Sequence, residues 1–245
     1  MRVAIMQPYF FPYLGYFQLI NAVDLFLLYD DVQYMKGGWI NRNRILQNGA
    51  PAWFSMPVRH AHFKLPISAR TYCDPIKNGS ALLSTLHTAY RKAPYFRCGI
   101  QLAEAIFTCG DESVVGYNHA ALLKICAYIG IKTPIDLTSN AKTDQTLNAE
   151  ERVIELCKQT HATQYINAAG GRHLYSSQLF SANNIELSFI EMDHNIEYCQ
   201  SMTTPIDKDF AQTPDFIQNL SIIDLIMFNS QPDVFKLSQK YAIVA

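Results

Sequence analysis

Two apolar runs decide the fold of this chain, Arg2-Val3-Ala4-Ile5-Met6 and Leu25-Phe26-Leu27-Leu28-Tyr29. Short continuous apolar runs are typical of strands buried on both faces. Gln7-Pro8 ends the first run, because proline has no backbone N–H to donate to a strand ladder. Residues 14–23 lie between the runs and carry apolar side chains at helical intervals. This strand, helix, strand unit predicts two parallel strands whose carboxyl ends share one sheet edge, where open α/β sheets bind ligands.

The next segments predict a β-hairpin and then a helical region. Residues 39–47 and 52–58 are rich in strand-forming side chains. They are joined by Asn48-Gly49, a pair that favours the positive φ angles of a tight hairpin turn. The spacing of apolar residues then becomes helical, with amphipathic helices expected over 80–93, 96–109 and 112–129.

Alternating strands and helices return after this region. Asn148, with Glu151 three residues later, forms a capping box at the start of a helix, and Ser221 with Asp224 caps a final apolar helix. Further segments with the expected patterns are strands over 134–138, 163–168 and 185–192 and helices over 148–159, 172–181 and 221–228.

This order of elements predicts an α/β fold. We expect a Rossmann-like, mostly parallel sheet with flanking helices, a β-hairpin and a helical insertion at about residues 79–130. Because no repeat, low-complexity tract or clear linker divides the chain, residues 1–245 are expected to form a single domain.

The composition is that of a globular protein without an extreme charge. The chain has 245 residues, of which 49% are hydrophobic, and 20 Lys and Arg stand against 21 Asp and Glu. The near-zero net charge argues against general nucleic-acid binding. No run reaches the roughly 18 apolar residues of a membrane span, and the opening run is too short for a signal peptide, so a cytoplasmic location is expected. The single, scattered cysteines are expected to be reduced core thiols: Cys73, Cys98, Cys109, Cys126, Cys157 and Cys199.

The segment from Pro8 to Phe17 is unusual, with six aromatic residues in ten positions. These side chains could form a hydrophobic plug under the sheet or one wall of a substrate pocket, since aromatic faces stack on sugar rings and bases. Gly15 would let a phosphate or carboxylate approach the N-terminus of the following helix. If the segment forms a pocket wall, the candidate binding residues are Gln7, Tyr9, Tyr13 and Tyr16.

Candidate acid–base residues follow the predicted strands. Asp30 and Asp31 end the second strand, where one of them could act as a general base or metal ligand, although Asp also ends strands for structural reasons alone. His194 follows a later strand and is a further acid–base candidate. His60 and His62 could bind a metal only with a third ligand from elsewhere, so no metal site is expected.

The predicted hairpin carries candidate anion-binding residues. In a strand, Arg42 and Arg44 lie on one face and Asn41 with Asn43 on the other. Guanidinium groups match planar oxyanions, so the two arginines form a candidate phosphate clamp, with a solvated hairpin face as the alternative. The candidate substrate-binding residues of this region are Tyr34, Trp39, Asn41, Arg42 and Arg44.

A second candidate anion site lies near residue 170. Asn167, Gly170 and Gly171 come between a predicted strand and a helix, where backbone N–H groups can meet an anion. A sharp turn that requires positive φ would explain the two glycines equally well.

The chain resembles the WbqC-like protein family from its opening string onward, Ile5-Met6-Gln7-Pro8-Tyr9-Phe10-Phe11-Pro12-Tyr13-Leu14-Gly15-Tyr16-Phe17-Gln18-Leu19-Ile20. The family is associated mainly with bacterial O-antigen and other surface-polysaccharide gene clusters. The resemblance implies an enzyme that transfers an acyl or aminoacyl group, such as glycyl, to a nucleotide-linked amino sugar. Further matching segments, which extend the resemblance over essentially the whole chain, are 30–34, 39–45, 90–96, the Gly170-Gly171 turn and 220–229.

This resemblance suggests roles for the candidate residues. The tyrosine-rich loop would stack on the sugar or base, Arg42 and Arg44 would hold the diphosphate, and Asp30, Asp31 or His194 would remove the amine proton. The expected partners are a nucleotide-sugar and an activated acyl donor, namely a thioester, an adenylate or an aminoacyl-tRNA, without membrane insertion. A homodimer through an exposed aromatic patch is left open.

A fainter similarity links the opening segment to the HIGH-motif nucleotidyltransferases. The positions of the two motif histidines carry Tyr13 and Tyr16, which can donate hydrogen bonds to a phosphate but cannot supply an imidazolium. Three hypotheses therefore stand: an acyl or aminoacyl transferase, a nucleotidyltransferase that uses Mg²⁺, and a nucleotide-sugar-binding protein without catalysis.

Overall fold

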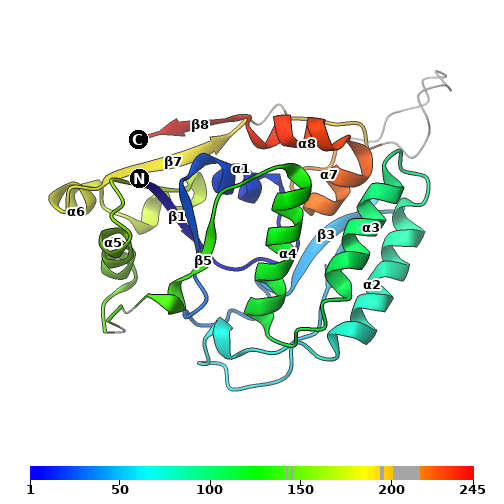
Figure 1. Cartoon of the computed structure of the whole chain (residues 1–245), viewed down its shortest axis with the longest axis horizontal. Helices are drawn as coiled ribbons and strands as arrows, with labels where there is room; N and C mark the ends of the chain where they lie inside the picture. The colour runs from blue at the N-terminus through cyan, green and yellow to red at the C-terminus, as the bar shows by residue number, and fades with distance from the viewer. Residues whose placement is uncertain (142, 145, 194–195, 201–215) are drawn as a thin grey trace.

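A six-stranded sheet forms the centre of the molecule in the computed structural model (Figure 1). Its strands are β1 (Arg2–Met6), β2 (Leu25–Leu28), β5 (Ile135–Leu137), β6 (Gln164–Ala168), β7 (Glu186–Met192) and β8 (Tyr241–Val244). They lie in the order β5-β2-β1-β6-β7-β8, and all neighbours are parallel except β7 and β8. This confirms the predicted Rossmann-like, mostly parallel sheet.

The structure describes residues 1–141, 143–144, 146–193, 196–200 and 216–245. A separate hairpin joins β3 (Arg42–Gln47) to β4 (Ala50–Ser55). The α-helices are α1 (Leu14–Ala22), α2 (Pro75–Tyr90), α3 (Phe96–Phe107), α4 (Val114–Ile129), α5 (Ala149–Gln159), α6 (Ser177–Ala182), α7 (Ile222–Phe228) and α8 (Gln231–Ser238). Short 3-10 helices are η1 (Ile67–Ala69), η2 (Thr138–Asn140) and η3 (Ala169–Leu174).

Different helices cover the two faces of the sheet. Successive side chains of a strand point to opposite faces, so Ala4 of β1 joins the core cluster that contains α1, α4, α7 and α8. Its neighbours Val3 and Ile5 join a second cluster with α5 and α6. Figure 1 shows α5 and α6 at the left of the sheet. The sheet is thus buried on both faces, which explains the continuous apolar runs of its strands.

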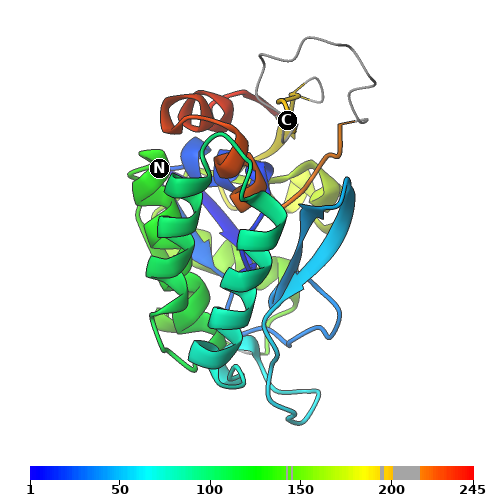
Figure 2. The ribbon, with the colours of Figure 1, turned by 90° about the vertical axis from the view of Figure 1, so that its right-hand side faces the viewer.

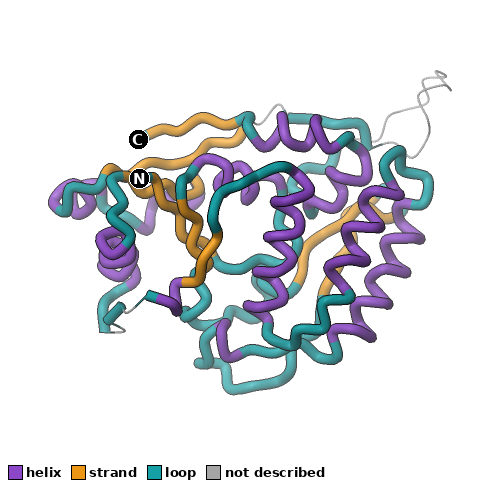
Figure 3. Tube along the Cα trace, in the orientation of Figure 1, coloured by secondary structure: helices purple, strands orange, loops and turns teal. Residues whose placement is uncertain are grey.

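The hairpin and helices α2 and α3 lie together beyond the sheet. Figure 2 shows the blue hairpin beside these helices, and Figure 3 shows that this half of the molecule is mainly helical. Phe54 of β4 packs on Phe107 of α3, with ring centroids 6.0 Å apart. Both rings belong to the large core cluster that also contains one face of the sheet, so the helical region shares a continuous core with the sheet.

Local sequence signals account for several element boundaries. The hairpin turn has φ angles of 52° at Asn48 and 75° at Gly49, as predicted. The side chain of Asn148 accepts a hydrogen bond from the Glu151 N–H, and the Glu151 carboxylate accepts one from the Asn148 N–H, which confirms the capping box. Asn184, two residues after the end of α6, has a positive φ of 58°, which asparagine tolerates better than most residues.

Other predictions were wrong in detail. The first hairpin strand begins at Arg42 instead of residue 39, and α2 begins at Pro75, because Asp74 caps it by accepting a hydrogen bond from the Lys77 N–H. The helix expected over 172–181 is divided into η3 and α6. Neither Gly170 nor Gly171 has a positive φ, so the turn does not require glycine for that reason.

The cysteines are unpaired, as expected, but they do not all lie in the core. Cys126 and Cys157 are buried, and burial raises the pKa of each thiol to about 12. Cys98, Cys109 and Cys199 are exposed. The exposed thiols correct the prediction of six core cysteines, since a cysteine within an apolar helical segment can still lie on its outer face.

Candidate functional site

The sheet has a topological switch point between β1 and β6. From β1 the chain continues through α1 to β2 on one side, whereas β6 and β7 lie on the other side. Ligands of open α/β sheets bind beside such a point, at the carboxyl ends of the strands. The relevant segments are therefore the loop after β1, the N-terminus of α1 and the residues that follow β6 and β7.

The loop after β1 is held in place by hydrogen bonds to its backbone carbonyls. The side-chain amide of Asn43 and the hydroxyl of Ser221 both donate to the carbonyl of the buried Phe11, at 2.8 and 2.9 Å. Asn118 donates to the carbonyl of Pro8 at 2.9 Å. Side chains from three distant elements thus fix the path of this loop. Its residues Phe10 and Phe11 are each only 1% exposed, so they form the hydrophobic plug that was one of the two expectations.

The tyrosines of this loop have different surroundings. Tyr16 is only 2% exposed, and its hydroxyl donates to the carbonyl of Gln7 at 2.8 Å. Tyr9 packs against Tyr16 with ring centroids 5.5 Å apart, and both Tyr9 and Tyr13 stay partly exposed. Burial raises the pKa of both phenols, so they remain protonated donors at neutral pH. Tyr9 and Tyr13 can therefore contact a ligand, whereas the hydroxyl of Tyr16 is buried and already bonded to the loop backbone.

A pocket of about 190 Å³ lies between the N-terminus of α1 and the residues that follow β7. This volume is below the roughly 300–1,000 Å³ of sites for drug-sized ligands, so the pocket suits a small molecule or one ring of a larger one. Its walls combine apolar side chains with phenols, amides and one carboxylate. The lining residues include Tyr13, Gly15, Gln18, Met192, Asp193, Tyr198, Phe216 and Asn219.

Two residues of α1 shape this pocket. A Cβ atom at Gly15 would lie 2.1 Å from Sδ of Met192, so the close approach of Met192 to the helix requires glycine. Gln18 is fully buried, and its Nε2 donates to the carbonyls of Leu237 and Lys240 at 3.0 and 2.8 Å. These two acceptors fix the orientation of the amide. The Gln18 Oε1 atom is left buried and without a partner in the described part of the chain.

A buried carboxylate supports the far wall of the pocket. Asp224 of α7 is 0% exposed and accepts hydrogen bonds from the hydroxyls of Tyr90 and Tyr198, at 2.7 and 2.6 Å, and from Gln200 Nε2 at 3.1 Å. Burial raises the pKa of Asp224, although the three donors oppose that effect. The pKa of Tyr198 is also raised, by burial and by the neighbouring carboxylate. Tyr198 thus lines the pocket as a neutral phenol in a fixed position.

Asp30 and Asp31 lie at the end of β2 and are bound to neighbouring elements. The hydroxyl of Thr138 donates to both carboxylates, at 3.0 and 2.7 Å, and the Ser139 N–H donates to Asp30. Asp31 also forms an ion pair with Arg152 of α5, and the side chains of both are mostly buried. These contacts join β2 to η2 and α5, so both aspartates have a structural role in this arrangement.

The hairpin arginines are not equivalent. Arg42 donates to the carbonyls of Gly37 and Gly38, and its guanidinium lies 4.2 Å from the ring centroid of Trp53. Arg44 lies 5.8 Å from the ring centroid of Trp39, and its buried Nε has no partner in the described part of the chain. Arg42 therefore supports the preceding loop, and Arg44 is the better candidate for binding an anion.

The remaining predicted site residues lie elsewhere. Asn167 donates to the hydroxyls of Tyr165 and Tyr175, at 2.8 and 3.0 Å, in the core on the α5 and α6 face of the sheet. Tyr34 donates to Asn41 Oδ1, and Asn41 in turn donates to the Met56 carbonyl, so this pair supports the hairpin. Gly170 has open space around it. His194 lies outside the described residues.

Sequence reasoning missed most of the pocket. Gln18, Asp193, Tyr198 and Asn219 come from three distant segments, namely α1, the residues after β7 and those before α7, and no local motif joins these segments. Asp224 was interpreted as part of a helix cap, although Ser221 alone accepts the capping hydrogen bond from the Ile223 N–H. A usable signal existed, because Asp224 is the one charged residue in the apolar run 220–228 and an acid at such a position must be buried with donors.

Comparisons with known proteins agree with the resemblance seen in the sequence. The model of the WbqC-like protein family matches residues 7–235. A protein of Mycobacterium tuberculosis, Uncharacterized protein Rv1507c, is 30% identical over 203 residues, which cover 81% of this chain and 86% of the relative. No solved structure matches this chain. None of the helices in the described residues has the length and apolar character that crossing a membrane would require.

Proposed function

Because this chain belongs to the WbqC-like protein family, whose members are associated with polysaccharide gene clusters, we propose that it is an enzyme of bacterial surface-polysaccharide assembly. In this proposal it transfers an acyl or aminoacyl group, such as glycyl, to the amine of a nucleotide-linked amino sugar. The observation that carries the proposal is the pocket beside the switch point, at the sheet edge where α/β folds bind nucleotide-linked ligands.

The chemistry of the pocket suits an amino sugar. Tyr13 and Tyr198 offer phenol groups and Asn219 an amide, all of which can bond to sugar hydroxyls. The carboxylate of Asp193 and the buried Oε1 of Gln18 are acceptors, which favours a ligand that carries an amine. The backbone of Arg44 lies near the pocket, since its carbonyl accepts a hydrogen bond at 2.8 Å from the N–H of Ser221, the residue after the pocket residue Leu220. Its guanidinium would hold the diphosphate.

The transfer needs one proton acceptor. The amine nitrogen attacks the acyl carbon, the donor's thiol, adenylate or tRNA hydroxyl leaves, and the attacking amine loses a proton. Asp193 is among the residues that line the pocket, whereas Asp30 and Asp31 are not. We therefore assign Asp193 as the general base that accepts the proton of the amine.

The nucleotidyltransferase alternative has less support. It would need both tyrosines that replace the motif histidines to reach the phosphates, but Tyr16 is buried and donates to the Gln7 carbonyl. The non-catalytic alternative predicts ligand binding without turnover, and the assay below distinguishes it.

The test is an activity assay with mass-spectrometric detection of the acylated sugar nucleotide. The purified protein is incubated with UDP- or dTDP-linked amino sugars and, in turn, an acyl thioester, an acyl adenylate and an aminoacyl-tRNA. We expect product with one donor class and a loss of about 100-fold in rate for Asp193→Asn, in the range typical of an acid–base residue. Asp233→Asn, at an exposed position on α8, is the matched control. Absence of product with all three donors would contradict the proposed activity.

A further inference from the structure

Residues 32–73 carry a local excess of positive charge, although the whole chain is nearly neutral. This segment contains six Lys and Arg but no Asp or Glu, although the complete chain has 20 basic and 21 acidic residues. It comprises the hairpin, the loop before it and the loop after it. A local positive field can therefore exist on a protein whose net charge is −1.

Hydrogen bonds join these three parts into one surface. The Gly38 N–H donates to the carbonyl of Met35, and Arg42 connects the same loop to Trp53 of β4. The Tyr34 N–H donates to the carbonyl of Leu65 at 3.2 Å. Figure 2 shows the hairpin and the cyan loop that follows it along one side of the molecule.

Large apolar side chains stand exposed on this surface. Met35 and Phe63 are each 64% exposed, Trp53 is 55% exposed and Leu65 is 37% exposed. Lys36 and Lys64 stand directly beside them in the chain and are also exposed. We name these six residues the basic apolar surface: Met35, Lys36, Trp53, Phe63, Lys64 and Leu65. Exposed apolar side chains on segments that are joined in this way mark a candidate interaction site.

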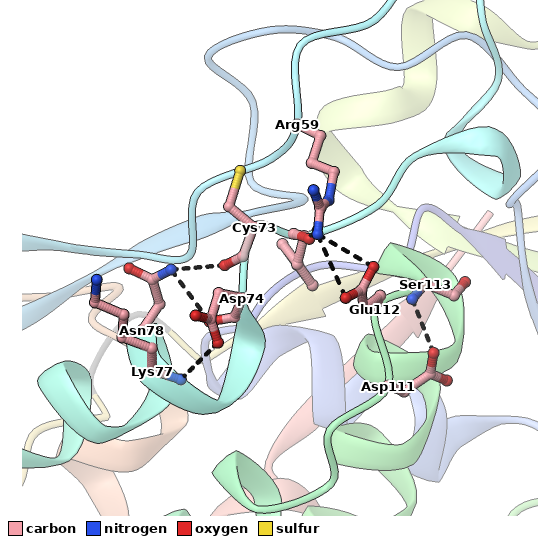
Figure 4. A network of polar contacts seen from close by, with 9 residues as sticks. Arg59, Cys73, Asp74, Lys77, Asn78, Asp111, Glu112 and Ser113 are labelled. Carbon is pink, nitrogen blue, oxygen red and sulfur yellow. Dashed lines mark hydrogen bonds and ion pairs between the residues drawn. The ribbon is translucent and has the colours of Figure 1, made fainter.

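The cations of the segment differ in their availability. Arg59 forms an ion pair with Glu112 at 3.3 Å, which Figure 4 shows beside the start of α4. Arg70 is buried and donates to the carbonyl of His62. Lys36 and Lys64 have no ion pair within the described residues, so both charges remain available to an anionic partner.

We propose that the basic apolar surface binds the headgroup region of an anionic phospholipid membrane. Tryptophan and other apolar side chains enter the boundary between headgroups and acyl chains, while adjacent lysines keep their charge among anionic headgroups. The surface would hold the protein at the membrane from one side, without a spanning helix. Its six residues are distinct from the pocket residues.

A lipid surface fits these side chains better than a nucleic acid does. Nucleic-acid binding uses aromatic rings with free faces and arginines directed at phosphates. Here the guanidinium of Arg42 lies over one face of the Trp53 ring, and Met35 and Leu65 offer aliphatic groups that do not stack on bases. At an anionic membrane the aliphatic side chains would be buried at the boundary with the acyl chains, while the neighbouring lysines would interact with the anionic headgroups.

Vesicle co-sedimentation of the full chain tests the proposal. We expect binding to vesicles of phosphatidylglycerol and phosphatidylcholine, weak binding to phosphatidylcholine alone, and a decrease of binding at high salt. Phe63→Ser with Lys64→Glu should weaken binding at least about tenfold, since it removes an inserted ring and reverses one charge. Because both side chains are exposed, this double variant should keep the fold, which its thermal melting temperature checks.

The matched control is Leu123→Ser with Lys124→Glu. These residues form an equivalent exposed pair of leucine and lysine on α4, outside the basic apolar surface. The control should bind anionic vesicles as the wild type does. The proposal is overturned by absence of binding to anionic vesicles, by equal losses in the two double variants, or by binding to RNA that the Phe63 and Lys64 substitutions abolish while vesicle binding persists.

Discussion

Two buried acidic sites in this protein are stabilised in opposite ways. Asp31, at the end of β2, pairs with the guanidinium of Arg152 and accepts a hydrogen bond from Thr138. Asp224, in α7, has no cation among its partners in the described residues and is surrounded by the hydroxyls of Tyr90 and Tyr198 and an amide. A cation favours a charged carboxylate, whereas neutral donors in an apolar core tolerate both protonation states.

The difference separates a structural site from one that borders the pocket. At the Asp31 site, the ion pair with Arg152 joins the end of β2 to α5, and the two opposite charges neutralise each other. The Asp224 site leaves one of its donors, Tyr198, lining the pocket. A carboxylate at a strand end is a frequent guess for a catalytic group, yet here the acid inside the apolar helix has the closer relation to the pocket. Each of the following predictions tests this contrast.

The largest effect is expected at the ion pair. Arg152→Ala would leave the carboxylate of Asp31 buried without its cation, since the two side chains are only 7% and 14% exposed. Loss of one partner of a buried pair costs about 3–5 kcal/mol of unfolding free energy. Urea unfolding monitored by circular dichroism measures this loss. A change below 1 kcal/mol would show that the pair is solvated in solution.

Asp224→Asn should have a smaller effect. An amide keeps one oxygen as an acceptor, but its NH₂ group must face either the Tyr90 hydroxyl or the two donors Tyr198 and Gln200, so at least one buried donor loses its acceptor. We expect a loss of about 1–3 kcal/mol in the same urea experiment. A loss as large as that of Arg152→Ala would contradict the distinction between the two sites.

The two phenols at Asp224 should not be equivalent. The Tyr90 hydroxyl donates to Asp224 and also accepts from the Leu46 N–H at 2.8 Å, whereas the Tyr198 hydroxyl borders the pocket. Tyr90→Phe leaves the Leu46 N–H without its acceptor, whereas Gln200 Nε2, which donates to the Tyr198 hydroxyl at 3.2 Å, keeps Asp224 and the Ile217 carbonyl as acceptors. Tyr90→Phe should therefore cost more stability than Tyr198→Phe, by about 1 kcal/mol. Tyr198→Phe should instead weaken binding of the sugar nucleotide, as titration calorimetry would show. The opposite order of the two stability losses would contradict this assignment.

The smallest effect concerns pH and has opposite signs at two aspartates. Burial raises the pKa of Asp224, so its contribution to stability is fully present below the ordinary pKa of 3.8 and is lost as the pH rises through the raised value. The pKa of the exposed Asp24 is lowered by its hydrogen bonds from Arg2, so its contribution is present above 3.8 and lost as the pH falls.

Unfolding at a series of pH values measures this contrast. The stability of the wild type relative to Asp224→Asn should decrease as the pH rises above about 4. The stability relative to Asp24→Asn should instead increase as the pH rises towards about 4 and stay constant above it, with a total change below about 1 kcal/mol because the Arg2 pair is exposed. Parallel pH profiles for the two variants would contradict the raised pKa of Asp224.

Much of the fold could be predicted from local patterns. The apolar runs 2–6 and 25–29, the Asn48-Gly49 turn and the capping box at Asn148 each depend on neighbouring residues alone, and each is present as expected. The terminal strand β8 was missed, since its four residues carry no turn signal and take their place by pairing with β7. Local sequence patterns therefore identify individual helices and strands, but they do not show which strands pair with one another.

The site was harder to predict for the same reason. Tyr90 and Asp224 are 134 residues apart in sequence, so the hydrogen bond between them has no local signature. The Pro8 to Phe17 segment was correctly identified as unusual, yet composition alone could not separate the buried Tyr16 from the accessible Tyr13. That distinction depends on the Gln7 carbonyl, which turns one phenol inward.

Calorimetric titration of a UDP- or dTDP-linked amino sugar into the wild type and Gly15→Leu tests the central claim, that the pocket between α1 and the end of β7 binds the substrate. A side chain at position 15 would meet Met192 and the Tyr13 ring, since even a Cβ atom would lie 2.1 and 2.6 Å from them, so it should fill the pocket. We predict binding by the wild type and by the control Leu123→Ser, and no measurable binding by a folded Gly15→Leu variant. Equal affinity of the wild type and Gly15→Leu would contradict the claim.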